Sequence, residues 1–444
     1  MKKIVKRFSI VSAGALLGST LGLASAAYAA GTTVACGQVI TTSITLANDI
    51  GPCLGDGLIV RGFSITVDLA GHTIKGAASD PASAIDQAGI HLDNVSGVTV
   101  KGGTVRGFFA GVLVKGGSGN TITDMKVFNN VGLGTTLYSD GIVLDGSTNN
   151  KVTTNRVTGN GPYAGIHMIN NASNNRVLRN FVADNHVPSI GLGPGGTDLA
   201  LDSGIALDSD SSYNVISDNQ VLRNGFFGIK LAGVGTSHDQ AINNTIKDNG
   251  NAGINAGGNG HTVAGNLIDH NGYEQFLPVG ATAGQNSRDG VITCGVPSPP
   301  GRPCGNDPAI IQDNSITRNA GIGVDLVFNG SQVTGGCGIY GCFPAEPYSP
   351  PRSNLVQRNI VRNNGGDGIF VECDQLYDAN FDATCITTSP DHKGQRILNN
   401  TTSGNGGANA GISAWDLHDQ NPRCDDDIWS GNTYDTAKPF CTTR

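Results

Sequence analysis

The sequence is poor in charged residues, in aromatic residues and, after its first thirty positions, in long apolar runs. Charged side chains make up 14% and aromatic side chains 6% of the 444 residues. Cations are the scarcer sign, with 28 Lys and Arg against 36 Asp and Glu; this argues against a nucleic-acid partner because phosphate binding needs a basic stripe. No later apolar run approaches the ~20 residues of a transmembrane helix, so no membrane partner is expected.

Residues 1–30 are typical of a secretory signal peptide. Four cations between positions 2 and 7 precede an apolar stretch at 8–27, and small residues follow at Ala29 and Ala30. Serines and a threonine interrupt the apolar stretch, which disfavours the alternative of a membrane anchor. We expect cleavage near Ala29 or Ala30 and a secreted protein, extracellular or at the cell surface. Without the leader, 24 Lys and Arg remain against 36 Asp and Glu, a formal charge of about −12.

Ten cysteines follow the leader, and an even number in an exported protein is typical of disulfides. Proximity in the sequence suggests five pairs: Cys36 with Cys53, Cys294 with Cys304, Cys337 with Cys342, Cys373 with Cys385, and Cys424 with Cys441. Zinc is the competing interpretation for Cys337 and Cys342, but neither a histidine nor a second close cysteine pair accompanies them.

Helical periodicity is also missing, and an internal repeat takes its place. A Gly followed by Ile or Val recurs at Gly89, Gly111, Gly141, Gly165, Gly204, Gly228, Gly253, Gly290, Gly323, Gly368 and Gly411. The short spacings of 22 to 25 residues define a unit, and the longer spacings are that unit plus an insertion.

A second signature lies between these glycines and consists of two Asn five residues apart, separated by an apolar alternation. The pairs are Asn155 and Asn160, Asn180 and Asn185, Asn219 and Asn224, Asn244 and Asn249, Asn266 and Asn271, Asn314 and Asn319, Asn359 and Asn364, and Asn400 and Asn405. Eight recurrences at one spacing are more than a general preference of Asn for turns explains. We expect each Asn to stack on the Asn of the next unit, where its amide bonds along the ladder and its tolerance of left-handed backbone is used.

Short apolar alternations broken by Gly and Asn predict short strands joined by sharp turns. One such unit cannot bury its apolar face alone, so successive units must stack with like residues over like. The predicted fold is all-β, a right-handed parallel β-helix of about 11 to 12 coils with disulfide-clipped loops; the handedness follows from the chirality of parallel crossovers. We divide the chain into a leader (1–30), an N-terminal cap (31–60), the β-helix (61–415) and a C-terminal cap (416–444).

The approach to the first coil carries the stretch Asp68-Leu69-Ala70-Gly71-His72-Thr73-Ile74. In this stretch the chain resembles the exported right-handed β-helix repeat proteins of the pectate-lyase-like superfamily, and the resemblance extends over about residues 55–415. It implies the fold and a polysaccharide partner. Motifs of polygalacturonases, of the best-known pectate lyases and of alginate epimerases are absent from the sequence, so the resemblance implies no residue roles.

Alternation after each Gly-Ile predicts outward-facing columns on one sheet. The first column reads His91, Leu113, Val143, His167, Ala206, Lys230, Asn255, Ile292, Asp325, Phe370 and Ser413. A second column, two residues further along each strand, contributes Asp145 and Asp208. Polar side chains concentrate over consecutive coils at Asp145, His167, Asp208, Lys230 and Asn255.

These columns predict a catalytic group of His167, Lys230 and Asp208, with Asp208 between the two cations. His167 or Lys230 would abstract a proton next to a carboxylate, and a cation would stabilise the enolate. Asp145, Asn255 and Asp325 are the predicted substrate-binding residues. Insertions at 132–140 and 188–203 would wall a cleft beside this group. The alternative is that these polar columns only solvate the sheet.

Two further carboxylate groups carry hypotheses of their own. Asp198, Asp202 and Asp210, with Asp208, would supply oxygen ligands to calcium, the one cofactor considered, and calcium would also reconcile an acidic protein with an acidic glycan. Asp capping its own turn is the competing interpretation. Glycoside hydrolysis would use a carboxylate pair drawn from Asp140, Asp289, Asp367 and Glu372, at a separation that the sequence does not fix.

The sequence therefore favours a carbohydrate-active protein, of lyase type, acting on an extended and uronate-containing glycan. A non-catalytic glycan-binding or structural rod is the first alternative, and a glycoside hydrolase is the second. Catalysis itself, the glycan and the oligomeric state are left open.

Overall fold

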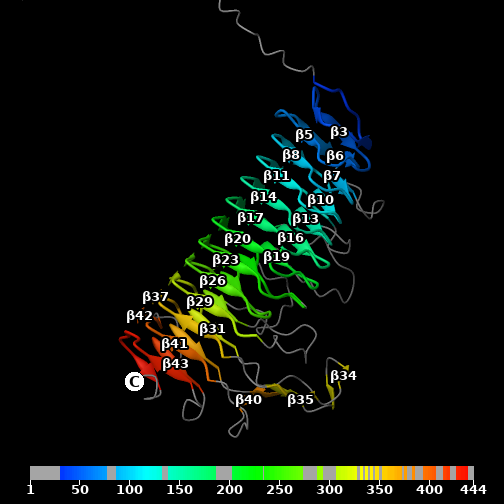
Figure 1. The fold of residues 1–444 in the computed structure, drawn as a ribbon. Coiled ribbons are helices and arrows are strands. Elements are labelled where there is room, and N and C mark those ends of the chain that lie inside the picture. The colour runs from blue at the N-terminus through cyan, green and yellow to red at the C-terminus, as the bar shows by residue number, and fades with distance from the viewer. Residues whose placement is uncertain are drawn as a thin grey trace, which may run out of the picture. The chain divides into compact units, whose positions relative to one another are not determined.

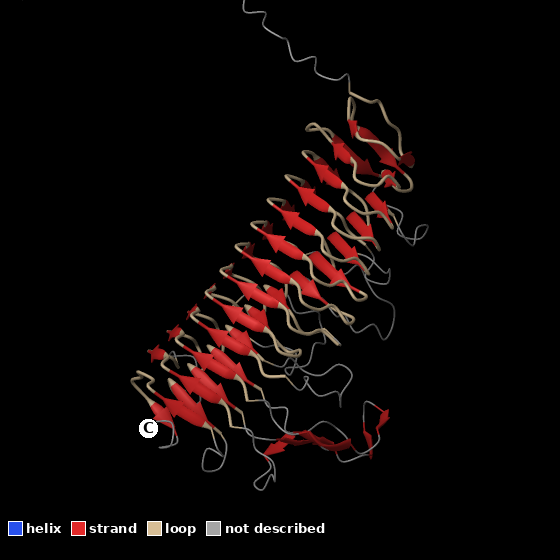
Figure 2. Cartoon of the chain, in the orientation of Figure 1, coloured by secondary structure: helices blue, strands red, loops and turns tan. Residues whose placement is uncertain are grey.

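The structure is a computed structural model, and in it the chain forms three parallel sheets whose strands alternate in sequence (Figure 1). It describes residues 31–77, 87–132, 139–186, 203–233, 235–273, 288–293, 307–327, 353–372, 394–406, 414–420 and 427–438, and the backbone of the strands within 331–349 and 375–385. The predicted leader lies outside these residues. The described residues contain strands, turns and loops and no helix, so none that is long and apolar enough to cross a membrane (Figure 2).

Each complete coil among the described residues contributes one strand to each sheet. Sheet 1 has the order β1 (Gln38–Ile40), β4 (Leu58–Val60), β7 (Ala88–Asp93), β10 (Ala110–Lys115), β13 (Asp140–Asp145), β16 (Ala164–Ile169), β19 (Ser203–Leu207), β22 (Ile229–Lys230), β25 (Ile254–Asn255), β28 (Val291–Ile292), β31 (Val324–Leu326), β38 (Ile369–Val371), β43 (Leu417–Asp419) and β45 (Ala437–Lys438). Sheet 2 has the order β2 (Ile44–Thr45), β5 (Thr66–Asp68), β8 (Thr99–Lys101), β11 (Thr121–Thr123), β14 (Lys151–Thr153), β17 (Arg176–Leu178), β20 (Val215–Ser217), β23 (Gln240–Ile242), β26 (Thr262–Ala264), β29 (Ile310–Gln312), β36 (Leu355–Gln357), β41 (Arg396–Leu398) and β44 (Ile428–Ser430).

Sheet 3 has the order β3 (Ile50–Cys53), β6 (Thr73–Gly76), β9 (Thr104–Arg106), β12 (Lys126–Phe128), β15 (Arg156–Thr158), β18 (Phe181–Ala183), β21 (Gln220–Leu222), β24 (Thr245–Lys247), β27 (Leu267–Asp269), β30 (Ser315–Thr317), β37 (Ile360–Arg362) and β42 (Thr401–Ser403). Short strands of the late insertions form two small sheets, from β32 (Ser331–Val333), β35 (Glu346–Ser349), β39 (Gln375–Tyr377) and β40 (Ala383–Cys385), and from β33 (Gly336–Gly338) and β34 (Gly341–Phe343).

The interior is a file of like residues, as the repeat predicts. Ile142, Ile166, Ile205 and Ile229 are register partners in successive strands of sheet 1, and all four are fully buried. The Gly before each of these residues is required by packing. A Cβ on Gly141 would lie 2.5 Å from the carbonyl oxygen of Gly165 in the next coil. The right-handed parallel β-helix is therefore confirmed.

Buried Asn ladders close the corners between the sheets. In the ladder that contains Asn180, the Asn155 amide donates to Asn180 Oδ1 at 3.0 Å and to the Ile122 carbonyl at 2.9 Å. The backbone N–H of Asn155 also donates to Asn180 Oδ1, at 2.9 Å. Because each ladder side chain accepts from one coil and donates to the next, its buried amide is satisfied within the protein.

Both predicted Asn series form such ladders, and the structure adds a third ladder that the sequence analysis missed. It runs through Asn120, Asn150, Asn175 and Asn214 to Asp239. One detail of the prediction was wrong. The left-handed backbone lies at the residue before the ladder Asn, for example at Thr154 (φ 54°) and Arg179 (φ 53°). The ladder position is selected for its amide and not for its backbone freedom.

The 12 strands of sheet 3 among the described residues agree with the 11 to 12 coils expected, and residues assigned to the two caps also form strands. Sheet 1 has 14 strands among the described residues, from β1 to β45. The predicted disulfide between Cys36 and Cys53 is present, with an S–S distance of 2.05 Å. Cys337 and Cys342 are register partners of β33 and β34. The side chains of the other eight cysteines lie outside the described residues.

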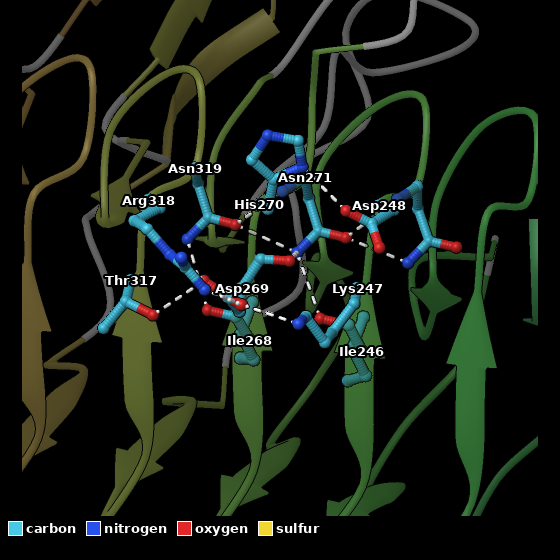
Figure 3. Close-up of polar contacts among 11 residues, drawn as sticks. Ile246, Lys247, Asp248, Ile268, Asp269, His270, Asn271, Thr317, Arg318 and Asn319 are labelled. Carbon is cyan, nitrogen blue, oxygen red and sulfur yellow. Dashed lines mark hydrogen bonds and ion pairs between the residues drawn. The ribbon is translucent and has the colours of Figure 1, made fainter.

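The outer surface of sheet 3 carries ion pairs between neighbouring coils (Figure 3). Asp269 accepts hydrogen bonds from Arg318 at 2.6 and 2.8 Å and from Thr317 at 2.9 Å, and Lys247 Nζ lies 3.0 Å away. We call these four residues the Asp269 cluster. The amides of Asn271 and Asn319 continue a ladder directly beside it (Figure 3).

Candidate functional site

The outward columns of sheet 1 follow the predicted order. His167 pairs with Val143 and Ala206, Lys230 pairs with Ala206 and Asn255, and Asp325 pairs with Ile292 and Phe370. The last position was predicted wrongly. Phe370 pairs with His418 and not with Ser413, because the strand after the final insertion lies at β43 and not at the last Gly-Ile.

Four residues of sheet 1 form a chain of alternating charge, which we call the His167 cluster. Asp140 Oδ1 lies 3.3 Å from His167 Nδ1, and His167 Nε2 lies 3.2 Å from Asp208 Oδ2. Lys230 Nζ donates to Asp208 Oδ1 at 2.8 Å. The predicted catalytic group is thus brought together with Asp208 between its two cations. Asp140, considered for hydrolysis from the sequence, instead lies behind the imidazole.

Burial and charge act in opposite directions within this cluster. Burial lowers the pKa of His167, but the charge and hydrogen bond of Asp140, and then those of Asp208, overcome it and raise that pKa to about 9. Burial raises the pKa of Asp208, but Lys230 and His167 lower it to about 2. Near neutral pH His167 is therefore an imidazolium and Asp208 is a carboxylate.

Tyr163 is a member of this site that sequence reasoning missed. It precedes β16, and its ring centroid lies 6.4 Å from that of His167. Burial, and then the charge of Asp140, raise the pKa of the Tyr163 phenol. The phenol consequently keeps its proton at neutral pH.

The contact of Asp140 with His167 belongs to a motif that recurs along sheet 1. The Asp before a strand accepts the backbone N–H of the equivalent residue in the next coil, as Asp140 does from Ala164 at 2.8 Å. The residue three positions after the one that donates this N–H then faces the same Asp, as His167 does after Ala164. Asp56 holds His91 at 3.2 Å in this way, and Asp367 holds His418 at 2.8 Å. The signal in the sequence is an Asp-Gly pair in one unit and a His in the next unit. That His comes three residues after the position that pairs with the Asp, as His167 comes after Ala164.

One copy of the motif has an acid where the others have histidine. Asp289 accepts the N–H of Ile322 at 2.7 Å, and the residue three positions after Ile322 is Asp325. Asp325 is 6% exposed, and its Oδ1 has no hydrogen-bond partner among the described residues. Burial, and then the charges of Glu372, Asp289 and Asp367, raise the pKa of Asp325 well above its ordinary value. We call these four acids the carboxyl cluster.

The three predicted binding residues lie at different places along sheet 1, and Asn255 is the register partner of Lys230. Asp145 accepts from Asn170 at 2.7 Å. Asn255 follows Lys230 in the next coil, and its Oδ1 accepts from Gly257 at 3.1 Å. Asp325, predicted to bind the same substrate, lies three coils beyond Lys230 in the carboxyl cluster.

The calcium hypothesis falls mostly outside the described residues. Asp198 and Asp202 are not among them, and neither is most of the two insertions expected to wall a cleft. Asp210 is exposed and lies in a turn, with a φ of 61°. Within the part of the chain that is described, no three His, Cys, Asp or Glu are arranged to hold a metal ion.

Comparisons with solved structures return proteins that resemble this chain weakly. The Dettilon tailspike protein is 17% identical with a TM-score of 0.43, over 90% of this chain and 60% of its own length. The A-module of the Azotobacter vinelandii mannuronan C-5 epimerase AlgE4 is 15% identical with a TM-score of 0.40, over 74% and 84%. A mannuronic acid specific family 6 polysaccharide lyase from human gut microbiota is 10% identical with a TM-score of 0.43, over 90% and 80%. These likenesses carry no argument about chemistry.

A comparison with curated protein sequences gave no match. The family model described as a right-handed beta helix region matches residues 56–287, which is more than half of the chain. The match covers the coils that carry the His167 cluster and ends before the carboxyl cluster. The chain belongs to the right-handed β-helix family.

Proposed function

We propose that this protein binds an extended, uronate-containing glycan along sheet 1 and cleaves it by β-elimination at the His167 cluster. One observation carries the proposal. The two cations are nearly buried, with side chains 10% and 14% exposed, whereas their shared counter-ion Asp208 is 28% exposed. Asp208 directly follows Leu207, the last residue of β19, and precedes the turn at Ser209 and Asp210. It therefore occupies the place that the carboxylate of a sugar would take.

Replacement of Asp208 by the carboxylate of a bound uronate would prepare the His167 cluster for catalysis. A uronate carboxylate that replaces Asp208 at Lys230 Nζ displaces Asp208, and this frees His167 Nε2. Coils are ~4.8 Å apart, so His167 and Lys230, two coils apart, are separated by about 10 Å along the stack, enough to flank one sugar ring. Asp140 remains behind the ring and holds its orientation.

The elimination then uses three side chains. His167 in its neutral form takes the proton from the carbon next to the carboxylate, and Lys230 stabilises the enolate charge. The electron pair forms the new C=C bond as the C–O bond to the leaving sugar breaks. The leaving oxygen takes its proton from the Tyr163 phenol. Because the pKa of His167 is about 9, its basic form becomes more abundant as the pH rises, and elimination should become faster towards that pH.

A panel of uronate-containing polysaccharides, followed by the ultraviolet absorbance of the unsaturated product, tests this function. Absorbance that appears with the wild type and disappears in His167→Gln supports it. A protein that binds these glycans and yields no unsaturated product is the non-catalytic rod, and the elimination proposal is then wrong. A chelator added to the same assay tests the calcium hypothesis, and secretion of the full-length chain tests the leader.

A further inference from the structure

The carboxyl cluster lies on the same face of sheet 1, towards its C-terminal end. Asp289 precedes β28, Asp325 lies in β31, and Asp367 and Glu372 flank β38. The backbone N–H of Glu372 donates to the carbonyl of Leu326 at 3.2 Å, so Glu372 lies one coil beyond Asp325 and diagonal to it. The elimination proposed above uses none of these four acids.

Asp325 is the acid of this cluster whose buried Oδ1 has no hydrogen-bond partner among the described residues. In three copies of the motif an imidazole nitrogen lies 2.8 to 3.3 Å from the Asp carboxylate. In this copy the residue at the histidine position is itself an acid, and a buried oxygen without a hydrogen-bond partner is unfavourable. A buried oxygen that points into an acidic cluster without a partner is the mark of a position kept for a ligand.

The surroundings of Asp325 suit a sugar. Phe370 is its register partner in the next coil and is partly exposed, and its ring lies against that of His418 with centroids 4.8 Å apart and planes tilted by 40°. An aromatic face beside a hydrogen-bonding group is a common platform for a sugar ring. The three neighbouring carboxylates create a negative potential at Asp325, which opposes an anionic residue. The ligand that fits is therefore an uncharged sugar.

We propose that the carboxyl cluster is a second catalytic centre, which hydrolyses a glycosidic bond of an uncharged sugar with Asp325 as acid and Glu372 as base. Asp325 donates its proton to the glycosidic oxygen as the bond from the anomeric carbon to that oxygen breaks. A water oxygen bonds to the anomeric carbon, and Glu372 takes the proton that this water loses. Two carboxyl groups in opposite protonation states are the usual requirement of this reaction. The inference shares with the proposed function only the premise that sheet 1 binds glycan.

The state of the two acids agrees with these roles. Burial and three neighbouring charges keep Asp325 protonated, whereas Glu372 is less buried. Burial, and then the charge of Asp289, raise the pKa of Glu372 above that of an ordinary Glu, so it becomes a stronger base. Asp367 accepts from His418 and from the N–H of Trp415, and its role is to position His418 and Phe370.

The test is the release of new reducing ends from xylan, mannan, β-glucan, arabinan and galactan. We expect release by the wild type, a loss of roughly 100-fold or more in Asp325→Asn and in Glu372→Gln, and no change in the control Lys247→Ala on sheet 3. Asp325→Asn should melt no lower than the wild type at pH 7, because it removes a buried acid. If it does not fold, the partly exposed Glu372→Gln carries the test.

The proposal is overturned if none of these glycans is cut, or if both variants cut them within twofold of the wild type. The unsaturated product from a uronate chain is measured on the same preparations. It reports on the His167 cluster alone, so the failure of one proposal is distinguishable from the failure of the other.

Discussion

Asp208 beside sheet 1 and Asp269 on sheet 3 have similar partners, since each bridges two basic side chains from other coils. Both carboxyl groups have a pKa of about 2, because burial, which raises it, is outweighed by hydrogen bonds and charges from the partners. The two clusters differ in whether the carboxylate or the basic side chains are exposed to solvent. On sheet 3 the carboxylate is 3% exposed and Arg318 is 61% exposed, whereas on sheet 1 the cations are buried and the carboxylate is the most exposed member.

This difference distinguishes the Asp269 cluster, a solvated group of ion pairs, from the His167 cluster, a candidate binding site. Arg318 and Lys247 extend along the surface and keep their heads in water, so Asp269 only tethers adjacent coils. His167 and Lys230 are held under the surface with an exchangeable counter-ion above them. Asp140, for which the Asp269 cluster has no equivalent among the described residues, fixes the imidazole from behind. Burial of the cations, and not the number of ion pairs, therefore distinguishes the two clusters.

The largest expected effect is on activity. His167→Gln and Lys230→Met should each lower elimination by roughly 100-fold or more, because each removes a group needed in the transition state. Arg318→Ala should leave the rate within twofold. Initial rates of ultraviolet absorbance measure this, and equal losses in all three variants would remove the distinction between the clusters.

The next effect is on stability. Asp208→Asn should lower the free energy of unfolding by on the order of 3 kcal/mol, because it leaves two buried cations without their shared partner. Asp269→Asn should cost about 1 kcal/mol, since its partners return to water. Urea denaturation at neutral pH compares the two variants, and an equal or larger cost for Asp269→Asn would contradict the comparison.

A smaller effect is expected in the dependence of stability on pH. The pKa of His167 rises from 6.5 to about 9 on folding, so its contribution is complete below pH 6.5 and is lost as the pH rises through 9. The wild type should lose about 2 kcal/mol between pH 7 and 10 that His167→Gln does not lose. Arg318→Ala is the matched control and should follow the wild type. Parallel curves for the wild type and His167→Gln would show that the imidazole is not held as described.

The smallest effect is the response to salt. The destabilisation by Arg318→Ala should disappear in concentrated salt, because the Debye length then falls to ~3 Å and the exposed pair is screened. The destabilisation by His167→Gln should persist, since its contacts exclude solvent. Thermal melting at low and high salt is sufficient to compare them. A salt-sensitive His167→Gln would mean that the cluster is more open than its exposure indicates.

The repeat made much of this structure predictable. The Gly-Ile recurrence gave the register of sheet 1 from His91 to Phe370, and the paired Asn gave two corner ladders. The prediction failed where an insertion separates the repeat from its strand, as with His418. It also missed the third ladder, although Asn150 lies five residues before Asn155 and shares the spacing of the predicted pairs. Regular spacing is informative because stacking forces equivalent positions to superpose, and it loses that power wherever the chain leaves the stack.

The sequence by itself determined the fold, the outward columns and the proximity of His167, Asp208 and Lys230, because one physical rule, like residues over like, converts spacing into contact. Only the tertiary structure decided which polar residues are buried. It placed Asp140 behind His167, and it set Asp325 against Asp289 where the other copies of the motif have a histidine. Burial depends on the surface that each coil presents to its neighbours, and the charge states of the two candidate sites follow from burial.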